Sequence, residues 1–343
     1  MRAYAILNLE VAEETFFDYY GIRTMAKMQL IAGRAHPQLA KKISKFLRVP
    51  LTPTKITTFA DGEIYVKIED KVRGDDIFII QPTPPPVNDN LIELLVIIDA
   101  LKRASAGRIN VISPYLGYCR QERKATSREP ISAKLVANMI SSAGADRVMT
   151  IDLHADAIQG FYDIPVDHFV GYPQFAKYFH EKEYDNLIVV SPDVGSAPRA
   201  RKMAGLLNVP FAVIDKRRTE HNKAETVTLI GEVKGKNCLI NDDMIDTAGT
   251  VTQACEMLKK RGAKNIYICA SHALLNGPAV KRLKACPATE VLILDTIPLP
   301  KEKKLDKIKI ISVASLLAKV IKRIHEGKSL GELFVWEKKV VNL

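Results

Sequence analysis

The feature that most constrains this chain is a regular alternation of strand-like and helix-like segments, which starts at residue 28. Short runs rich in β-branched and aromatic residues are followed by longer stretches with helical periodicity. This order predicts parallel sheets covered by helices on both faces. The expected strands are 28–32, 76–81, 109–114, 148–153, 187–191, 211–215, 226–233, 238–241, 266–270, 291–294 and 308–313. The expected helices are 36–47, 89–105, 132–143, 198–207, 250–261, 278–285 and 314–326.

The order strand, loop, helix, strand occurs twice, with a break near residues 170–185. A chain of 343 residues is long enough for two domains that each bury a core. We therefore expect two similar α/β domains in tandem, at 28–173 and 174–310. Residues 1–27 would form an N-terminal extension, and residues 311–343 a helix and tail that we place against the first domain.

The composition predicts a protein whose cysteines are reduced thiols and which has no membrane-spanning segment. The five cysteines form no CxxC pair, and Cys269 with His272 lacks the second pair that a metal site would need. Most of the cysteines lie in apolar runs, so a structural role is expected. No apolar run reaches the ~18 residues of a membrane span. Residues 1–27 carry four acids and no apolar core segment, unlike a targeting peptide. We expect a cytoplasmic protein with no membrane partner.

The net charge of +11 raises the alternative of a nucleic-acid-binding protein. The basic residues are spread along the chain, aromatic residues make up only 7%, and no RNA- or DNA-binding module is recognisable. A protein that handles several phosphate groups also needs positive charge. We therefore expect no nucleic-acid partner.

The most informative segment is CLINDDMIDTAGT at 238–250. A strand runs into a loop of small and hydroxylated residues, and a helix follows. Backbone N–H groups and the hydroxyls of Thr247 and Thr250 could face a phosphate, Gly249 permits close approach, and the helix N-terminus adds a favourable dipole. The alternative is an ordinary capped turn, since Thr250 and Gln253 fit a capping box.

Two adjacent acids, Asp242 and Asp243, come directly before this loop. Their carboxylates would lie about one sugar's length from the phosphate, which suits a pair of ribose hydroxyls, bound directly or through Mg²⁺. The GKS triplet at 327–329 is not the end of a P-loop, because Lys322 stands where that motif needs glycine. A nucleoside triphosphate would have to be held in another way.

Polar residues also follow other predicted strands, where open α/β sheets bind ligands. Alternation along 148–153 puts Asp152 and His154 on one face, able to share a metal or a phosphate, although a lone histidine there is more often structural. Arg120, Gln121, Arg123 and Lys124 form a basic and polar run after a strand, for which a solvated loop is the alternative.

Two further segments fit phosphate chemistry less specifically. DKRR at 215–218 places three cations at a strand end, before a loop at 219–225. Cations above a transferring phosphoryl group stabilise its charge, and a closing loop excludes water, but a charged turn is the alternative. In FADGE at 59–63, the ring of Phe59 could stack on a base; from the residues alone, a surface turn before the alternating strand 64–68 is preferred.

Several motifs, in this order and spacing, resemble the ribose-phosphate diphosphokinase family, and the similarity covers residues 28–334. The loop at 238–250 likewise resembles the signature loop of phosphoribosyl diphosphate-binding proteins. The other motifs are TFADGEIYV at 58–66, PPVNDNL at 85–91, YCRQERK at 118–124, REPI at 128–131, DLHA at 152–155 and GFYDIPVD at 160–167.

The resemblance implies two tandem phosphoribosyltransferase-like domains, the first binding ATP and the second ribose 5-phosphate, with Mg²⁺ as cofactor. It implies Lys216 and Arg218 as the catalytic pair. The ATP-binding residues that it implies are Phe59, Asp61, Glu63, Arg120, Gln121, Arg123 and Lys124. Those for ribose 5-phosphate are Arg218, Asp242, Asp243, Asp246, Thr247, Ala248, Gly249 and Thr250. The metal-binding residues are His154, Asp193 and Asp152, with the contributions of Asp163 and Asp167 left open.

The resemblance also implies a homo-hexamer that responds to phosphate and ADP as effectors. SVASLLA at 312–318 resembles part of that regulatory site, but Lys71 stands where relatives often carry a small polar residue. Other departures are Cys119, Asn241 and Pro198, none of which removes a group that the chemistry requires. A non-catalytic associated subunit of the same family is the alternative, and the joint presence of Lys216, Arg218, His154 and the acid pair argues against it.

Overall fold

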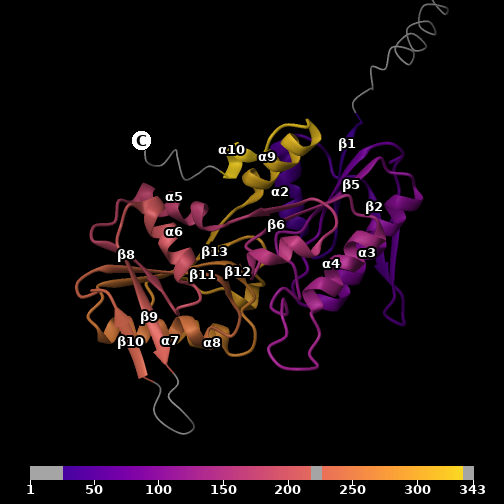
Figure 1. The fold of residues 1–343 in the computed structure, drawn as a ribbon. Coiled ribbons are helices and arrows are strands. Elements are labelled where there is room, and N and C mark those ends of the chain that lie inside the picture. Colours follow the sequence, from indigo (N-terminus) through magenta and orange to yellow (C-terminus); the bar gives the residue numbers. More distant parts are fainter. Residues whose placement is uncertain (1–25, 218–225, 335–343) are drawn as a thin grey trace, which may run out of the picture.

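The computed structural model describes residues 26–217 and 226–334, which form two large sheets side by side with helices around them (Figure 1). The first sheet has five parallel strands in the order β1-β4-β5-β6-β7. Helices α2, α3 and α4 follow β1, β4 and β5 in their respective connections. The strands are β1 (Met28–Ala32), β4 (Asp76–Ile80), β5 (Arg108–Ile112), β6 (Arg147–Ile151) and β7 (Val166–Phe169). The helices are α2 (Pro37–Leu47), α3 (Val87–Arg103), α4 (Ser132–Ala143) and the short 3₁₀ turn η1 (Asp156–Phe161).

A separate antiparallel hairpin, β2 (Thr54–Thr58) and β3 (Ile64–Ile68), packs through β3 on α3. It carries the segment 59–63 at its tip. The hairpin therefore stands outside the five-stranded sheet.

The second sheet has seven strands in the order β10-β9-β8-β11-β12-β13-β14, all parallel to their neighbours except β10. The strands are β8 (Leu187–Ser191), β9 (Phe211–Arg217), β10 (Thr226–Ile230), β11 (Asn237–Ile245), β12 (Asn265–Ala273), β13 (Glu290–Leu294) and β14 (Ile308–Ile311). The helical elements are α5 (Tyr172–Lys182), α6 (Ala197–Leu207), α7 (Gly249–Lys260), α8 (Ala279–Ala285), η2 (Lys301–Lys303), α9 (Ala314–His325) and α10 (Gly331–Phe334).

Strands β4 and β8 are buried along their whole length, as parallel strands covered on both faces should be. One continuous apolar cluster joins the two sheets. It contains Leu30 and Phe78 from the first sheet, Val189 from the second and Leu317 from α9. Helix α9 lies against α2 (Figure 1). This shared core sets the carboxyl ends of the two sheets at a defined position relative to each other.

The predicted fold class, tandem α/β domains with mainly parallel sheets, is confirmed. Helix α5 (Tyr172–Lys182) was not predicted, and it fills most of the break at 170–185 between the two repeats. Its buried side chains Tyr172, Phe175 and Phe179 recur at helical spacing, but polar residues between them hid the pattern. Strands β2 and β7 were not predicted either. The domain boundaries remain a proposal; residues 173 and 174 lie in the first turn of α5.

Within the described ranges 26–217 and 226–334, no helix is long and apolar enough to cross a membrane. The five cysteines are buried and free of disulfides. Burial raises the pKa of Cys119 and Cys238 to about 12, which keeps both thiols protonated near neutral pH. These cysteines contribute apolar packing.

Candidate active site between the two halves

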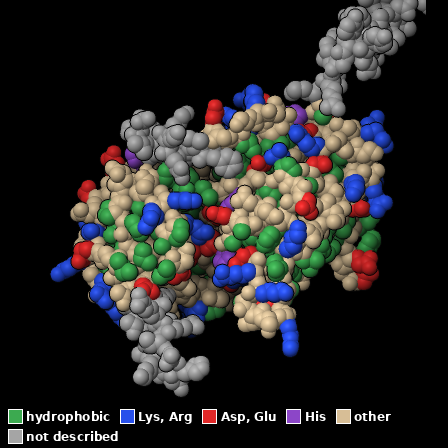
Figure 2. All heavy atoms as spheres, viewed as in Figure 1, with side chains coloured by type: hydrophobic (Ala, Val, Ile, Leu, Met, Phe, Trp, Pro, Cys, Tyr) green, Lys and Arg blue, Asp and Glu red, His purple; other side chains and the backbone are tan. Residues whose placement is uncertain are grey.

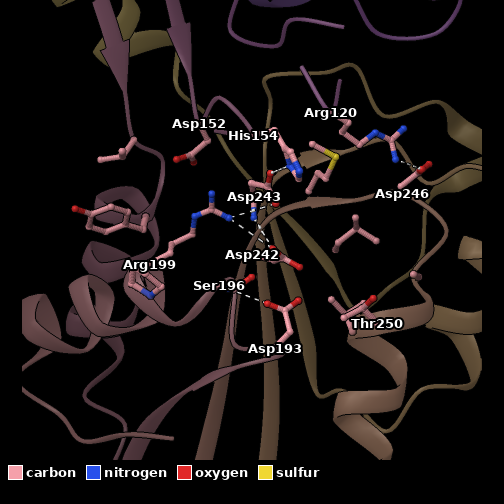
Figure 3. Close-up of a pocket in the computed structure, with 18 of the residues that line it drawn as sticks. Arg120, Asp152, His154, Asp193, Ser196, Arg199, Asp242, Asp243, Asp246 and Thr250 are labelled. Atoms are coloured by element: carbon pink, nitrogen blue, oxygen red, sulfur yellow. Dashed lines mark hydrogen bonds and ion pairs between the residues drawn. The ribbon is translucent and has the colours of Figure 1, made fainter. Parts of the chain in front are cut away.

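A cavity of about 660 Å³ opens between the two halves, at the carboxyl ends of strands from both sheets (Figure 2). Acidic, basic and histidine side chains gather in this hollow. The first half contributes Arg120, Asp152, His154 and Asp156 to the lining, and the second contributes the segments around Asp193, Arg199 and the loop before α7. Figure 3 shows the central side chains pointing toward one another.

The loop between β11 and α7 forms one wall, and all of Asp246, Thr247, Ala248, Gly249 and Thr250 line the cavity. Asn276 donates to Asp246 Oδ1 at 2.8 Å. Arg282 holds the same loop by donating to the carbonyl of Thr247 at 3.0 Å. These contacts from outside the loop fix its path.

Helix α7 begins at Gly249, and its N-cap Ala248 has a positive φ of 61° with no side-chain cap. The predicted capping box is wrong, because Thr250 is already the second residue of the helix. The first-turn N–H groups of a helix have no partner within the helix. At this uncapped end they are available to an anion in the cavity.

The acid pair lies at the end of β11, in the floor of the cavity. Burial and the neighbouring Asp243 raise the pKa of Asp242 to about 7. Burial acts in the same direction on Asp243, but the hydrogen bond from His154 and the charge of Arg199 outweigh it and lower the pKa of Asp243. The two neighbouring carboxyls therefore differ in acidity, and Asp243 loses its proton at lower pH than Asp242 does.

His154 lies directly opposite this pair, with Nδ1 2.8 Å from Asp243 Oδ2. The hydrogen bond to Asp243 raises the pKa of His154, against the effect of burial. The contact joins the first half of the chain to the second, as Figure 3 shows.

Asp152 lines the same cavity, but the prediction that Asp152 and His154 share one face of a strand is wrong. Strand β6 ends at Ile151, and Asp152 has a positive φ of 43°. Its carboxylate accepts from the N–H of Gly171 at 2.8 Å and from the hydroxyl of Ser271. Asp152 is thus held by groups around the cavity and does not share a strand face with His154.

Asp193 follows β8 and accepts from the N–H of Ser196 through Oδ1 at 2.8 Å. Among residues 26–217 and 226–334, no three His, Cys, Asp or Glu side chains are grouped closely enough to hold a metal ion by themselves. Mg²⁺ commonly binds through one or two carboxylates, with waters and substrate phosphates completing its shell. The carboxylates of Asp193 and Asp152 fit that mode of binding.

Arg199 is one of the cavity residues that the sequence analysis did not predict; Asp156, Ser196 and Lys202 are others. Arg199 lies in the first turn of α6, and its Nη1 is 3.6 Å from Asp242 Oδ1 and 3.3 Å from Asp243 Oδ1. Burial lowers the pKa of the guanidinium, but the charges of Asp152, Asp243 and Asp242 outweigh it and raise that pKa. Arg199 is therefore a permanent cation among three acids.

Of the predicted ATP-binding residues, Arg120 reaches the cavity, where its Nη1 lies 2.6 Å from Asp246 Oδ2. Gln121, Arg123 and Lys124 lie on an exposed loop and do not line the cavity. Phe59, Asp61 and Glu63 lie on the exposed β2–β3 hairpin, where the Phe59 side chain packs near Tyr65. The single chain does not bring these last three residues to the cavity.

The two predicted catalytic cations are less fully described. Lys216 is the sixth residue of β9, the strand next to β8, but its side chain lies outside what the structure describes. Arg218 lies outside the described residues altogether. Asp167, which was left open, pairs with Arg147 at 2.7 Å.

Known proteins match the chain along most of its length. Residues 28–144 match the N-terminal domain of ribose phosphate pyrophosphokinase, and residues 218–335 match the phosphoribosyl synthetase-associated domain. The ribose-phosphate pyrophosphokinase of Caldanaerobacter subterraneus subsp. tengcongensis is 56% identical over 90% of this chain and 98% of its own length. That of Clostridium perfringens is 53% identical over 90% and 97%.

A solved structure agrees. The crystal structure of phosphoribosylpyrophosphate synthetase from Mycobacterium smegmatis matches with a TM-score of 0.84 and 44% identity, over 88% of this chain and 99% of that one. The sequence motifs, the paired sheets and the cavity between them agree with these matches. The chain therefore belongs to the ribose-phosphate pyrophosphokinase family.

Proposed function

We propose that this chain is a ribose-phosphate diphosphokinase, which transfers the diphosphoryl group of ATP to the anomeric hydroxyl of ribose 5-phosphate. The products are phosphoribosyl diphosphate and AMP. One observation carries the proposal: a single cavity has His154 and Arg120 of one half facing Asp243 and Asp246 of the other. Relatives that are 50% identical or more carry the same activity in their names.

Ribose 5-phosphate binds on the second half of the chain in this proposal. Its phosphate lies at the uncapped N-terminus of α7, where the N–H groups of Gly249 and Thr250 and the Thr247 hydroxyl donate to it. Asp242 and Asp243 accept hydrogen bonds from the sugar hydroxyls. The anomeric carbon then faces the first half of the chain.

ATP binds with its phosphates toward Arg120 and His154. Asp193, His154 and Asp152 would hold Mg²⁺ there, and the bound ion would neutralise phosphate charge and polarise the phosphoryl group under attack. Asp152 is already oriented by Gly171 and Ser271, so its carboxylate needs little rearrangement. Gln121, Arg123 and Lys124 extend this ATP-binding side along the adjoining loop.

The anomeric hydroxyl attacks the β-phosphorus in line, the bond from that phosphorus to the bridging oxygen breaks, and AMP leaves. Lys216 and Arg218 neutralise the charge on the equatorial and leaving oxygens. Strand β9 supports this role, because it runs beside β8, which leads into Asp193. Catalysis then rests on positioning and electrostatics, with little covalent chemistry from the protein.

The exposed hairpin supports an assembly of several copies. Phe59 is 54% exposed and does not line the cavity of its own chain, so we assign Phe59, Asp61 and Glu63 to the adenine end of ATP in a neighbouring subunit. We extend the proposal to a homo-hexamer in the cytoplasm, with phosphate and ADP as effectors.

The test is AMP formation by the isolated chain with ATP, ribose 5-phosphate and Mg²⁺. We expect equal amounts of AMP and phosphoribosyl diphosphate, and no AMP when ribose 5-phosphate or Mg²⁺ is omitted. Absence of AMP under all conditions would contradict the proposal and indicate a non-catalytic associated subunit. ADP as the nucleotide product would instead indicate transfer of a single phosphoryl group.

A further inference from the structure

Arg199 contacts both members of the acid pair with one nitrogen. Nη1 lies 3.6 Å from Asp242 Oδ1 and 3.3 Å from Asp243 Oδ1. The Arg199 side chain is 21% exposed, against 15% for Asp242 and 8% for Asp243. Figure 3 shows the guanidinium reaching the pair from α6, inside the cavity. All three side chains are mostly buried, so their charges interact more strongly than charges at the surface do.

The backbone that carries Arg199 is firmly anchored. Pro198 lies at the start of α6, and the next residues toward the core, Ala200 and Met203, are fully buried. They belong to the apolar cluster that joins the two sheets. Arg199 is therefore presented to the acid pair by a rigid element, as a precise binding site requires.

Two adjacent carboxylates repel each other unless a cation lies between them. His154 contacts Asp243 alone, whereas Arg199 contacts both acids. A guanidinium keeps its charge at every physiological pH, so it is a constant counter-charge. Sugar hydroxyls, in turn, need acceptor oxygens held at fixed positions.

We infer that Arg199 is a positioning residue for sugar recognition: it holds the carboxylates of Asp242 and Asp243 side by side, so that together they accept the ribose hydroxyls. This inference rests on the proposed function. In this inference, the preference for a sugar phosphate that carries both ring hydroxyls depends on Arg199, which acts by positioning Asp242 and Asp243. Removing Arg199 should then weaken recognition of the hydroxyls, while the α7 end of the site still binds the phosphate.

The test compares ribose 5-phosphate with 2-deoxyribose 5-phosphate, which keeps the anomeric hydroxyl and the phosphate but lacks one of the hydroxyls. We expect the wild-type chain to prefer ribose 5-phosphate in kcat/KM by about 10- to 100-fold, as the loss of a hydrogen bond to a charged acceptor implies. If turnover of the deoxy sugar is too slow, its inhibition constant against ribose 5-phosphate gives the same comparison.

Arg199→Met keeps the aliphatic stem but removes the charge, and it should reduce this preference about tenfold. The KM for ATP should stay within about twofold of wild type. Arg199→Lys restores a cation and should give an intermediate preference. Arg201→Met is the matched control: Arg201 lies on the same helix, stacks over Phe211 at 5.3 Å and does not line the cavity, so the preference should not change.

The inference is overturned if Arg199→Met leaves the preference unchanged, whether or not it lowers activity on both sugars. It is also overturned if Arg199→Lys loses as much preference as Arg199→Met. If the methionine variant does not fold, Arg199→Gln replaces it in both comparisons. A wild-type chain that forms no AMP would contradict the proposed function itself, before any variant is compared.

Discussion

Asn241 carries a buried amide for which the described part of the chain supplies no hydrogen-bond partner, and replacing it should stabilise the protein. Asn241 lies in β11 directly before the acid pair and is 1% exposed, and neither Oδ1 nor Nδ2 has a hydrogen-bond partner among residues 26–217 and 226–334. Burying an unpaired amide costs about 1–3 kcal/mol by protein mutational measurements. Leucine has nearly the same shape and no polar atoms, so Asn241→Leu should raise the free energy of unfolding by about 1–3 kcal/mol.

The same strand supplies a matched control. Asn237 is also buried, but its Nδ2 donates to the Asp185 carbonyl at 2.7 Å and its Oδ1 accepts from Asn265 at 2.9 Å. Asn237→Leu breaks both bonds and should destabilise the protein by about 1–3 kcal/mol. Urea unfolding of the two variants measures both effects. A loss of stability in Asn241→Leu similar to that in Asn237→Leu would refute the reasoning, since it would mean that the amide is satisfied.

Lys216→Ala should lower AMP formation by about two orders of magnitude or more with an unchanged circular dichroism spectrum; near-normal turnover would rule out its catalytic role. Arg120→Met removes the ion pair with Asp246, and because Arg120 is half exposed the melting temperature should barely change. The KM for ATP should rise several-fold, because Arg120 faces the ATP phosphates in the proposed complex; an unchanged KM for ATP would contradict that assignment. Asp76→Asn should cost about 2–4 kcal/mol, measured by urea unfolding, because the buried carboxylate accepts two hydrogen bonds from Arg108. Burial raises the pKa of Asp76, but its hydrogen bonds with Arg108 and other partners outweigh burial and lower it. This stabilisation is therefore present above the unfolded value of about 3.9 and is lost as the pH falls through the lower folded value. If the free energies of unfolding of Asp76→Asn and wild type still differ by the same amount below the folded pKa of Asp76, the predicted pH dependence is wrong. Removal of Mg²⁺ with a chelator should abolish AMP formation, and added Mg²⁺ should restore it.

The fold class could be predicted because its signals are local. The runs 187–190 and 77–80 are fully apolar and too short for helices, as strands buried on both faces are. The missed elements carry weaker signals. The hairpin strand β2 is only partly buried, and α5 buries aromatic rings between polar residues. In both cases tertiary packing decides the structure, and local pattern alone does not.

The candidate site likewise contains residues that local sequence predicts and residues that only the tertiary fold brings together. Asp242, Asp243 and the loop at 246–250 form one contiguous segment, so their spacing alone indicates a ligand site. Arg199 comes from α6 and meets the acids only because β8 and β11 are neighbours in the sheet. No spacing along the chain encodes that contact. The prediction for Asp152 failed for a different reason: β6 ends at Ile151, two residues before the predicted end of the strand, so the period of two no longer applies there.

The central claim is that one cavity between the two halves binds both substrates. A crystal structure with ribose 5-phosphate, Mg²⁺ and a non-hydrolysable ATP analogue tests it directly. We predict density for the sugar phosphate at the N-terminus of α7, with its hydroxyls on Asp242 and Asp243, and for the triphosphate beside His154 and Asp193. Density for the two ligands on separate surfaces of the assembled protein would contradict the account.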